Sequence, residues 1–319
     1  MDLINFEASS EALLVPTLIY KEGEKCSWRY VEFFTAEIRN RNTRKAYLHA
    51  VKRFFDWCER NELSLLEVKP FHVAAYVETH QESAPTIKQH LAAIKMLFDY
   101  LVTGQVIPAN PASSVRGPKY VIKKGKTPVL SGEDARTLLD SIDANTVIGA
   151  RDKALVGIMI YSFARVSAVL SMNVSDYYLN GRRYWIRLHE KGGKYHEVPV
   201  HHKAEEYMEH YLNLSGIKND KNGPLFRSTQ GRSQILKQKS LSRYDAIDMI
   251  QRRAKKAGVN EGISCHTFRA TGITAYLMHG GTIENAQRIA AHESPRTTKL
   301  YDRRSDEISL DEIERVIID

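Results

Sequence analysis

The stretch RRYWIRLHEKGGKYHEVPV, residues 182–200, departs from the helical periodicity of the sequence around it. Apolar residues alternate with polar ones along its first half, as in a strand with one buried face. These apolar residues are Tyr184, Ile186 and Leu188. A Gly-Gly pair and a returning apolar run follow, so the stretch predicts a β-hairpin with Lys191 and Lys194 at its tip. One hairpin among helices predicts a mainly α fold with a small β-sheet, an α+β protein.

Helical patterns fill the sequence before the hairpin. In residues 42–60, NTRKAYLHAVKRFFDWCER, the apolar side chains share one helical face, and Asn42 is the predicted N-cap. A second helix is predicted after Pro70 and a third through residues 86–102. The predicted buried stripe of the third helix is Ile87, Leu91, Ile94, Leu97 and Leu101.

Prolines, glycines and lysines interrupt the helical pattern in residues 104–128. This composition is typical of a basic linker between a small helical domain and a larger one. The predicted larger domain opens at Ser131, which forms a capping pattern with Asp134 ahead of an apolar run. The expected boundaries are an N-terminal extension at 1–28, a helical domain at 29–115, a linker at 116–128 and a second domain at 129–319.

The bulk composition limits the classes of function. The 319 residues carry a net charge of +8, which favours a polyanionic partner such as nucleic acid. No apolar run approaches the roughly 20 residues of a membrane span, and the N-terminus shows no signal-peptide pattern. Three distant cysteines fit neither a disulfide framework nor a zinc site, so we expect a reducing, cytoplasmic setting.

Several residues could carry chemistry. Arg165 lies at a break between two apolar helical segments, and His266 and Arg269 are three apart at a predicted helix start. His292 precedes Tyr301 by nine residues. Cationic and imidazole groups without a cluster of carboxylates suit the stabilisation of a phosphate without a metal ion. A tyrosine hydroxyl in such an electropositive pocket could act as a nucleophile.

The order and spacing of these residues resemble the motifs of the tyrosine recombinase (phage integrase) family. The matching positions are Arg165, Lys191, His266, Arg269, His292 and Tyr301. The resemblance extends over roughly residues 30 to 319, because residues 86–111 look like the last helix of the family's core-binding domain and its exit. It implies a two-domain, C-shaped clamp on double-stranded DNA, with a helical core-binding domain and a catalytic domain.

The family resemblance also implies a mechanism. Tyr301 would attack a DNA phosphodiester to give a 3′-phosphotyrosyl link, and strands would be exchanged through a Holliday junction without ATP, metal or another cofactor. Arg165, Arg269 and His292 would stabilise the transition state, His266 would accept the tyrosine proton, and Lys191 would protonate the leaving oxygen. The expected DNA contacts are Arg44, Lys45, Thr86, Lys88, Gln89, Lys119, Lys123 and Lys124.

Assembly is expected as well. Apolar residues at helical spacing in the tail, residues 309–319, predict a C-terminal helix. The family resemblance implies that this helix packs on a neighbouring protomer, giving a tetramer on two DNA sites. The other reading of this tail is a helix packed on its own domain. Accessory DNA-bending proteins could act as further partners, and a mobile element is the expected genetic setting.

Some alternatives stay open at this point. Ala168 and Ala270 stand where the family usually has an acidic residue and a histidine, so acidic support for Arg165 is expected from elsewhere. The two substitutions also allow a DNA-binding protein with impaired catalysis, and related chemistry allows a type IB topoisomerase. Lys194 is an alternative to Lys191. The histidines around the hairpin lack zinc-binding spacing, so no metal site is predicted.

Overall fold

The computed structural model describes residues 15–120, 125–190, 195–231, 233–259 and 262–303. The chain forms two compact units, Met1–Val121 and Ile122–Asp319. Within the described ranges, no helix is long and apolar enough to cross a membrane.

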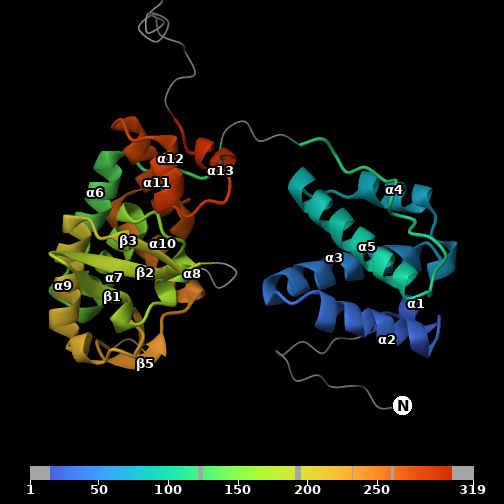
Figure 1. The fold of residues 1–319 in the computed structure, drawn as a ribbon, viewed down its shortest axis with the longest axis horizontal. Coiled ribbons are helices and arrows are strands. Elements are labelled where there is room, and N and C mark those ends of the chain that lie inside the picture. Colours follow the sequence, from blue (N-terminus) through green and yellow to red (C-terminus); the bar gives the residue numbers. More distant parts are fainter. Residues whose placement is uncertain (1–14, 121–124, 191–194, 232, 260–261, 304–319) are drawn as a thin grey trace, which may run out of the picture. The chain divides into compact units, whose positions relative to one another are not determined.

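The first unit is a bundle of helices, drawn in blue to teal in Figure 1. Its two long helices, α3 and α5, pack against each other. The helices are α1 (Thr17–Tyr20), α2 (Glu24–Glu32), α3 (Arg41–Arg60), α4 (Pro70–Thr79) and α5 (Ala84–Thr103), with a π-helical turn at Phe33–Glu37 and a 3-10 turn at Leu65–Glu67.

The apolar stripes that the sequence predicts for α3 and α5 are buried in one core. All five predicted positions of α5 are buried, so that prediction is confirmed, and every one except Ile87 belongs to this core. The predicted N-cap Asn42 is wrong by two residues, because the side chain of Asn40 accepts the backbone N–H groups of Asn42 and Thr43. The same core includes Leu18 and Ile19, which lie ahead of the domain boundary expected at residue 29.

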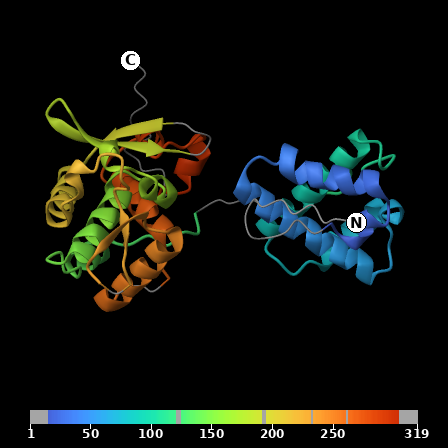
Figure 2. The same cartoon turned by 90° about the horizontal axis from the view of Figure 1, so that it is seen from below.

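The second unit combines helices with two small antiparallel sheets (Figures 1 and 2). Its helices are α6 (Gly132–Asp140), α7 (Val147–Tyr161), α8 (Val166–Leu170), α9 (His202–Ser215), α10 (Arg243–Ala257), α11 (Cys265–Met278), α12 (Ile283–Ile289) and α13 (Pro295–Lys299). Its strands are β1 (Tyr177–Asn180), β2 (Arg183–His189), β3 (Tyr195–Pro199), β4 (Arg227–Thr229) and β5 (Leu236–Ser240).

Helix α7 is the central helix of this unit. It is buried around most of its circumference, as its nearly continuous apolar sequence predicts, and it packs against α9 and α11. Gly272 of α11 makes a close approach possible, because a Cβ at this position would lie 2.0 Å from the carbonyl oxygen of Ile160. The end of α7 therefore lies directly beside the first turns of α11.

The predicted hairpin is confirmed by the pairing of β2 with β3. The strands are antiparallel, with Ile186 opposite Val198 and Leu188 opposite His196. β1 pairs with the other edge of β2, so the sheet order is β1-β2-β3. The sheet runs along one side of the unit (Figure 2). Lys191 and Lys194, expected at the tip, lie outside the described residues.

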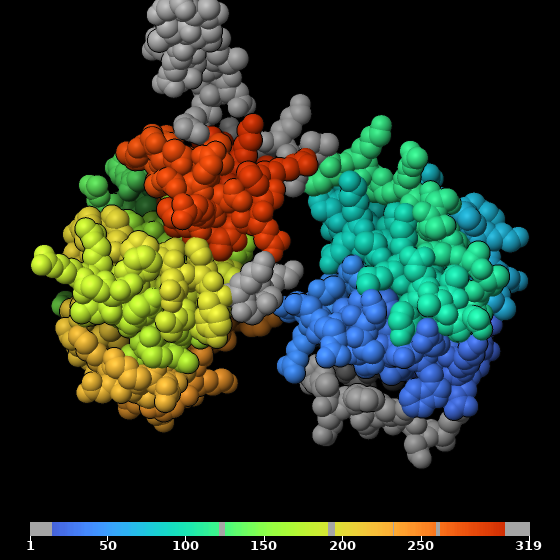
Figure 3. Space-filling view, viewed as in Figure 1, coloured from blue at the N-terminus to red at the C-terminus, as the bar shows by residue number. Residues whose placement is uncertain are grey.

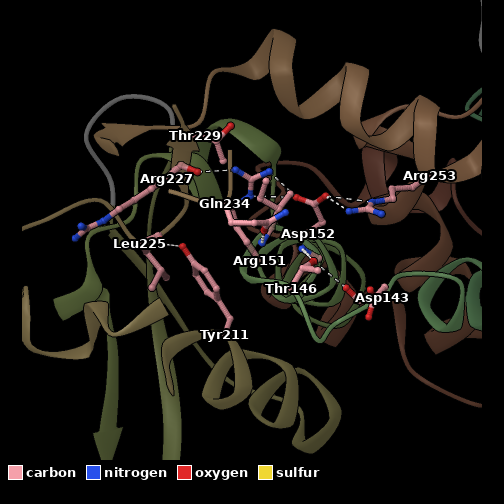
Figure 4. A network of polar contacts seen from close by, with 12 residues as sticks. Asp143, Thr146, Arg151, Asp152, Tyr211, Leu225, Arg227, Thr229, Gln234 and Arg253 are labelled. Atoms are coloured by element: carbon pink, nitrogen blue, oxygen red, sulfur yellow. Dashed lines mark hydrogen bonds and ion pairs between the residues drawn. The ribbon is translucent and has the colours of Figure 1, made fainter. Parts of the chain in front are cut away.

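A buried polar network fixes α7 to two other elements (Figure 4). Asp152 accepts hydrogen bonds from Arg151 at one carboxylate oxygen and from Arg253 of α10 at the other, with shortest distances of 2.7 Å each. Arg151 also donates to the backbone carbonyl of Arg227 in β4 at 2.7 Å. Each buried charge in the network thus has a partner, which avoids the cost of an unpaired ion in the core.

The three cysteines are free and buried. Cys26 and Cys58 belong to the core of the first unit, and Cys265 packs in that of the second. Burial raises the pKa of Cys26 and Cys265 to about 11 and that of Cys58 to about 12.

Candidate active site

Arg165 occupies the break between α7 and α8. The chain turns sharply there because Phe163 adopts a left-handed conformation with φ of 54°, which is unfavourable for a bulky residue. Arg165 is the N-cap of α8, and its carbonyl accepts the N–H of Val169 at 3.1 Å. Its guanidinium forms an ion pair with the carboxylate of Glu190, at the end of the hairpin strand β2. The guanidinium of Arg165 at this helix break is therefore held by a carboxylate from the sheet.

Arg269, on the second turn of α11, is almost completely buried. One of its terminal nitrogens donates to the carbonyl of Phe163, and the other donates to the carbonyl of Ala290 at 2.7 Å. Ala290 caps α12 and precedes Ala291, which is also left-handed, with φ of 47°. Arg269 therefore connects two strained turns, one that leads to Arg165 and one that leads to His292.

His292 is buried against the short helix α13. Its Nδ1 atom lies 2.9 Å from the hydroxyl oxygen of Thr298, and its backbone carbonyl accepts from the side chain of Gln287 at 3.0 Å. The imidazole stacks almost parallel to the ring of Tyr301, with 5.8 Å between ring centroids. These contacts fix both the position and the plane of the imidazole.

Tyr301 follows α13 directly and has its hydroxyl within hydrogen-bond distance of a histidine. The Nε2 atom of His266, on the first turn of α11, lies 2.7 Å from the Oη atom of Tyr301. The backbone carbonyl of Tyr301 accepts the hydroxyl of Thr274 at 2.9 Å. Helix α11 thus contacts Tyr301 at both its side chain and its main chain.

The segment that enters the second unit also supports the tyrosine. Gly125 donates its N–H to the carbonyl of Leu300 at 3.0 Å, and Arg303 donates to the carbonyl of Gly125 at 2.7 Å. A Cβ at position 125 would lie 2.6 Å from the Leu300 oxygen, so the approach requires glycine. The tyrosine is therefore held on both sides by contacts with the entering segment.

The pocket keeps its histidines neutral. The pKa of His266 lies below its usual 6.5, mainly because the imidazole is buried. The nearby guanidinium groups of Arg269 and Arg165 lower it further. The same causes, with a smaller effect from His266, lower the pKa of His292 to about 3. Burial raises the pKa of Tyr301, whereas Arg269 and Arg165 oppose that rise. Near neutral pH the pocket therefore contains a protonated phenol and a neutral imidazole that can accept its proton.

Five of the six expected catalytic residues converge on this pocket: Arg165, His266, Arg269, His292 and Tyr301. They come from the α7–α8 break, α11 and the segment around α13, which are separate in sequence. In the space-filling view the red surface of α11–α13 adjoins the yellow-green surface of the sheet (Figure 3). The sixth residue, Lys191, lies outside the described residues.

Sequence reasoning missed three polar residues of the site. Glu190 pairs with Arg165, Thr298 contacts His292, and Thr274 holds the backbone of Tyr301. A carboxylate next to the candidate lysine was visible in the sequence and could have indicated the first of these. The two threonines have no distinctive spacing.

Six of the eight residues expected to contact DNA lie ahead of residue 121, in the described part of the chain. Lys45, Lys88, Gln89 and Lys119 are exposed. Arg44 uses its guanidinium to bind the carbonyl of Ile38 at 3.0 Å, and the hydroxyl of Thr86 lies 2.9 Å from that of Ser83. Lys123 and Lys124 lie outside the described residues.

The histidines near the hairpin have structural partners. His189 lies 3.4 Å from the carboxylate of Asp176, His196 lies 2.9 Å from the carbonyl oxygen of Ile289, and His201 caps α9. Among the described residues, no group of three or more His, Cys, Asp or Glu side chains is arranged to hold a metal ion.

Comparison with known proteins shows the family to which this chain belongs. The model of the phage integrase family matches residues 128–307, and that of its N-terminal SAM-like domain matches residues 29–105. The chain belongs to the phage integrase family. Tyrosine recombinase XerC of Myxococcus xanthus is 30% identical over 250 residues, which cover 76% of this chain and 80% of the relative.

Solved structures of this family share the fold. The XerH site-specific recombinase bound to its difH substrate in a pre-cleavage complex is 19% identical, with a TM-score of 0.64, over 85% of this chain and 78% of that one. A lambda integrase tetramer bound to a Holliday junction is 15% identical, with a TM-score of 0.65, over 88% of this chain and 79% of that one. This phage integrase family member is therefore a mainly helical protein with small antiparallel sheets, as the sequence predicts.

Proposed function

We propose that this protein is a site-specific DNA recombinase that cleaves and rejoins strands through a covalent tyrosine intermediate. The observation that carries the proposal is the 2.7 Å contact between Tyr301 Oη and His266 Nε2 in a pocket that also contains two guanidinium groups. The membership of the chain in the phage integrase family supports the same function.

In the cleavage step, the Oη atom of Tyr301 attacks the phosphorus of a DNA phosphodiester. The new bond joins this oxygen to phosphorus, and the bond from phosphorus to the 5′-oxygen breaks. The phenol proton passes to the neutral imidazole of His266, which the contact between them allows. The products are a 3′-phosphotyrosyl link and a free 5′-hydroxyl.

Fixed cations stabilise the charge that develops on the phosphate. Arg269 is rigid because both its terminal nitrogens are bound to backbone carbonyls, and Arg165 is anchored by Glu190. Such preorganised donors need little rearrangement during the reaction. The stacked imidazole of His292 supplies a further donor. Lys191, with Lys194 as the alternative, protonates the leaving 5′-oxygen.

The phosphotyrosyl link conserves the energy of the broken bond. A 5′-hydroxyl can therefore attack it in the reverse step without ATP, and attack from a second duplex exchanges strands. Lambda integrase has been seen as a tetramer on a Holliday junction. We infer the same assembly for this chain, with the tail at residues 309–319, outside the described residues, packed on a neighbouring protomer.

The two units have separate roles in this proposal. The first unit, whose core extends back to Leu18 and Ile19, is the core-binding domain, residues 116–128 are a basic linker, and residues 129–319 are the catalytic domain. The net charge of +8 and the exposed Lys45, Lys88 and Lys119 support contacts to DNA phosphates. Affinity is therefore expected to fall steeply with rising salt concentration.

A covalent-capture experiment tests the function. The protein is incubated with a pool of nicked, randomised duplexes whose cleavage releases a short fragment, so that the phosphotyrosyl adduct accumulates. We expect a denaturation-resistant adduct that Tyr301→Phe abolishes while DNA binding is retained, because the substitution removes only the attacking hydroxyl. The captured sequences then identify the preferred site.

The same experiment separates the other candidates. Absence of any adduct would favour a protein that only binds DNA. Adducts without sequence preference, together with relaxation of supercoiled plasmid, would favour a type IB topoisomerase. Joining of two duplexes that both contain the captured site identifies recombination.

A further inference from the structure

The ion pair of Arg165 has an unexpected origin. The acidic residue that could support Arg165 from its own helix is absent, because position 168 holds an alanine that is buried in the core. The carboxylate of Glu190 contacts Nη1 of Arg165 instead, from the end of the hairpin strand. Support for this cation therefore comes from the sheet and not from α8.

The two side chains of this ion pair differ in how deeply they are buried. The side chain of Glu190 is only 8% exposed, whereas that of Arg165 is 38% exposed. The carboxylate thus lies behind the guanidinium, on the protein side, and the ion pair leaves part of the guanidinium accessible to a phosphate. Two exposed long side chains would give little positional control, but here one partner is fixed by burial.

From this geometry we infer that Glu190 is a positioning residue for the DNA cleavage reaction, which holds the Arg165 guanidinium in place for the scissile phosphate. The inference rests on the proposed function. Glu190 does not touch the reacting atoms in this role and acts through Arg165. The carboxylate of Glu190 also lies near two guanidinium groups, those of Arg165 and Arg269, which repel each other. Its negative charge offsets part of that repulsion.

The ion pair also helps to hold the base of the hairpin, because Glu190 lies where the strand β2 ends. Glu190 directly follows His189, the last residue of β2, and directly precedes Lys191. His189 lies 3.4 Å from the buried carboxylate of Asp176, which precedes β1. The base of the hairpin is therefore anchored at two adjacent residues, one to the start of α8 and one to the segment before β1. The ion pair links the placement of Arg165 to that of the strand that leads into the candidate general acid.

The experiment measures cleavage and binding separately. One nicked duplex captured by the wild-type protein serves as the probe for single-turnover cleavage and for equilibrium binding. We expect Glu190→Gln to slow cleavage about 10- to 100-fold, because a small misplacement of a reacting group costs up to about that much. The dissociation constant for DNA should stay within about twofold, and Glu190→Asp, which retains the charge, should recover part of the rate.

Glu197→Gln is the matched control. Glu197 lies in β3 of the same hairpin and pairs with an arginine, Arg187, at 2.9 Å, but both side chains of this pair are exposed, so solvent screens their interaction. The same chemical change at this position should leave the cleavage rate unchanged. A loss equal to that of Glu190→Gln would indicate a general effect of hairpin charge and would overturn the inference.

A double-mutant cycle tests whether Glu190 acts through Arg165. If it does, Glu190→Gln should cause little further loss of cleavage in an Arg165→Ala background, whereas independent contributions would multiply. Full additivity would contradict the inference. So would faster cleavage and tighter DNA binding by Glu190→Gln, which would mean that the carboxylate competes with the phosphate. A wild-type protein that forms no adduct would instead refute the proposed function itself.

Discussion

Tyr301 and His266 form a pair whose chemistry depends on the protonation of the imidazole. His266 can accept the phenol proton only when it is neutral, and burial together with Arg269 and Arg165 lowers its pKa below 6.5. As the pH falls, the imidazole is therefore expected to remain a base below the pKa of a free histidine.

This gives a prediction for pH dependence. Single-turnover cleavage, measured between about pH 5 and 8, should stay on its plateau through pH 6.5 and decline only at lower pH. DNA binding measured over the same range separates weaker association from slower chemistry. A decline with its midpoint at or above pH 6.5 would argue against His266 as the base.

Thr298 provides a second prediction for a single residue. Its fully buried hydroxyl lies 2.9 Å from Nδ1 of His292, so Thr298→Val should free the imidazole to rotate and lower the cleavage rate about 10-fold. The neighbouring Thr297 is exposed, and Thr297→Val is the control that should have no effect. Equal rates for the two variants would show that the hydroxyl does not orient His292.

The sequence predicted which residues come together in the pocket better than it predicted the residues that support them. Arg165, His266, Arg269, His292 and Tyr301 could be found because their types and spacings match family motifs. The carboxylate of Glu190 and the hydroxyl of Thr298 act through contacts between distant segments. A linear pattern does not encode such contacts, because they depend on where the hairpin and α13 pack in three dimensions.

The segment ahead of α6 contacts the backbone next to Tyr301 and limits where that backbone can lie. Gly125→Ala would place a Cβ 2.6 Å from the carbonyl oxygen of Leu300, so the backbone next to Tyr301 must shift. We expect cleavage to fall about 10-fold or more while DNA binding stays within about twofold, measured on the same duplex.

Gly132→Ala is the control for this substitution. A Cβ at position 132, in the first turn of α6, meets no atom within 4 Å. This variant should therefore cleave as the wild type does. If Gly125→Ala also cleaved normally, the contact with Leu300 would have no role in placing the nucleophile.

Periodicity in the sequence predicted which segments are helices and which are strands, but it did not predict the residues at which they begin and end. The stripes of α5 and the alternation of β2 are visible in the sequence because burial selects side chains at fixed intervals. The start of α3 was predicted two residues late, because Asn40 and Asn42 are equally good capping residues and only tertiary packing decides between them. The left-handed turns at Phe163 and Ala291 could not be predicted from the sequence, because neither position holds a glycine.

The buried network around Asp152 is expected to stabilise the second unit of the molecule. Asp152→Asn should destabilise this unit by about 3 kcal/mol, because it leaves Arg151 buried without its carboxylate. Hydrogen exchange of α7 amides reports the change for this unit alone, since the two units need not unfold together.

An exposed pair is the matched comparison for this prediction. Glu206→Gln removes the partner of Lys203 on the surface of α9, where both side chains are largely exposed. Its effect on stability should be below about 1 kcal/mol. Similar protection of α7 in both variants would mean that the network contributes little to stability.

The state of the three cysteines affects how the protein withstands oxidants. Oxidants and alkylating reagents react with the thiolate form, and thiols whose pKa is about 11 or 12 provide almost none of it at neutral pH. Cys265 is adjacent to the proposed base His266, so sulfur modification there would distort the catalytic centre. We therefore expect mild peroxide to leave this thiol unmodified and the neighbouring imidazole in place.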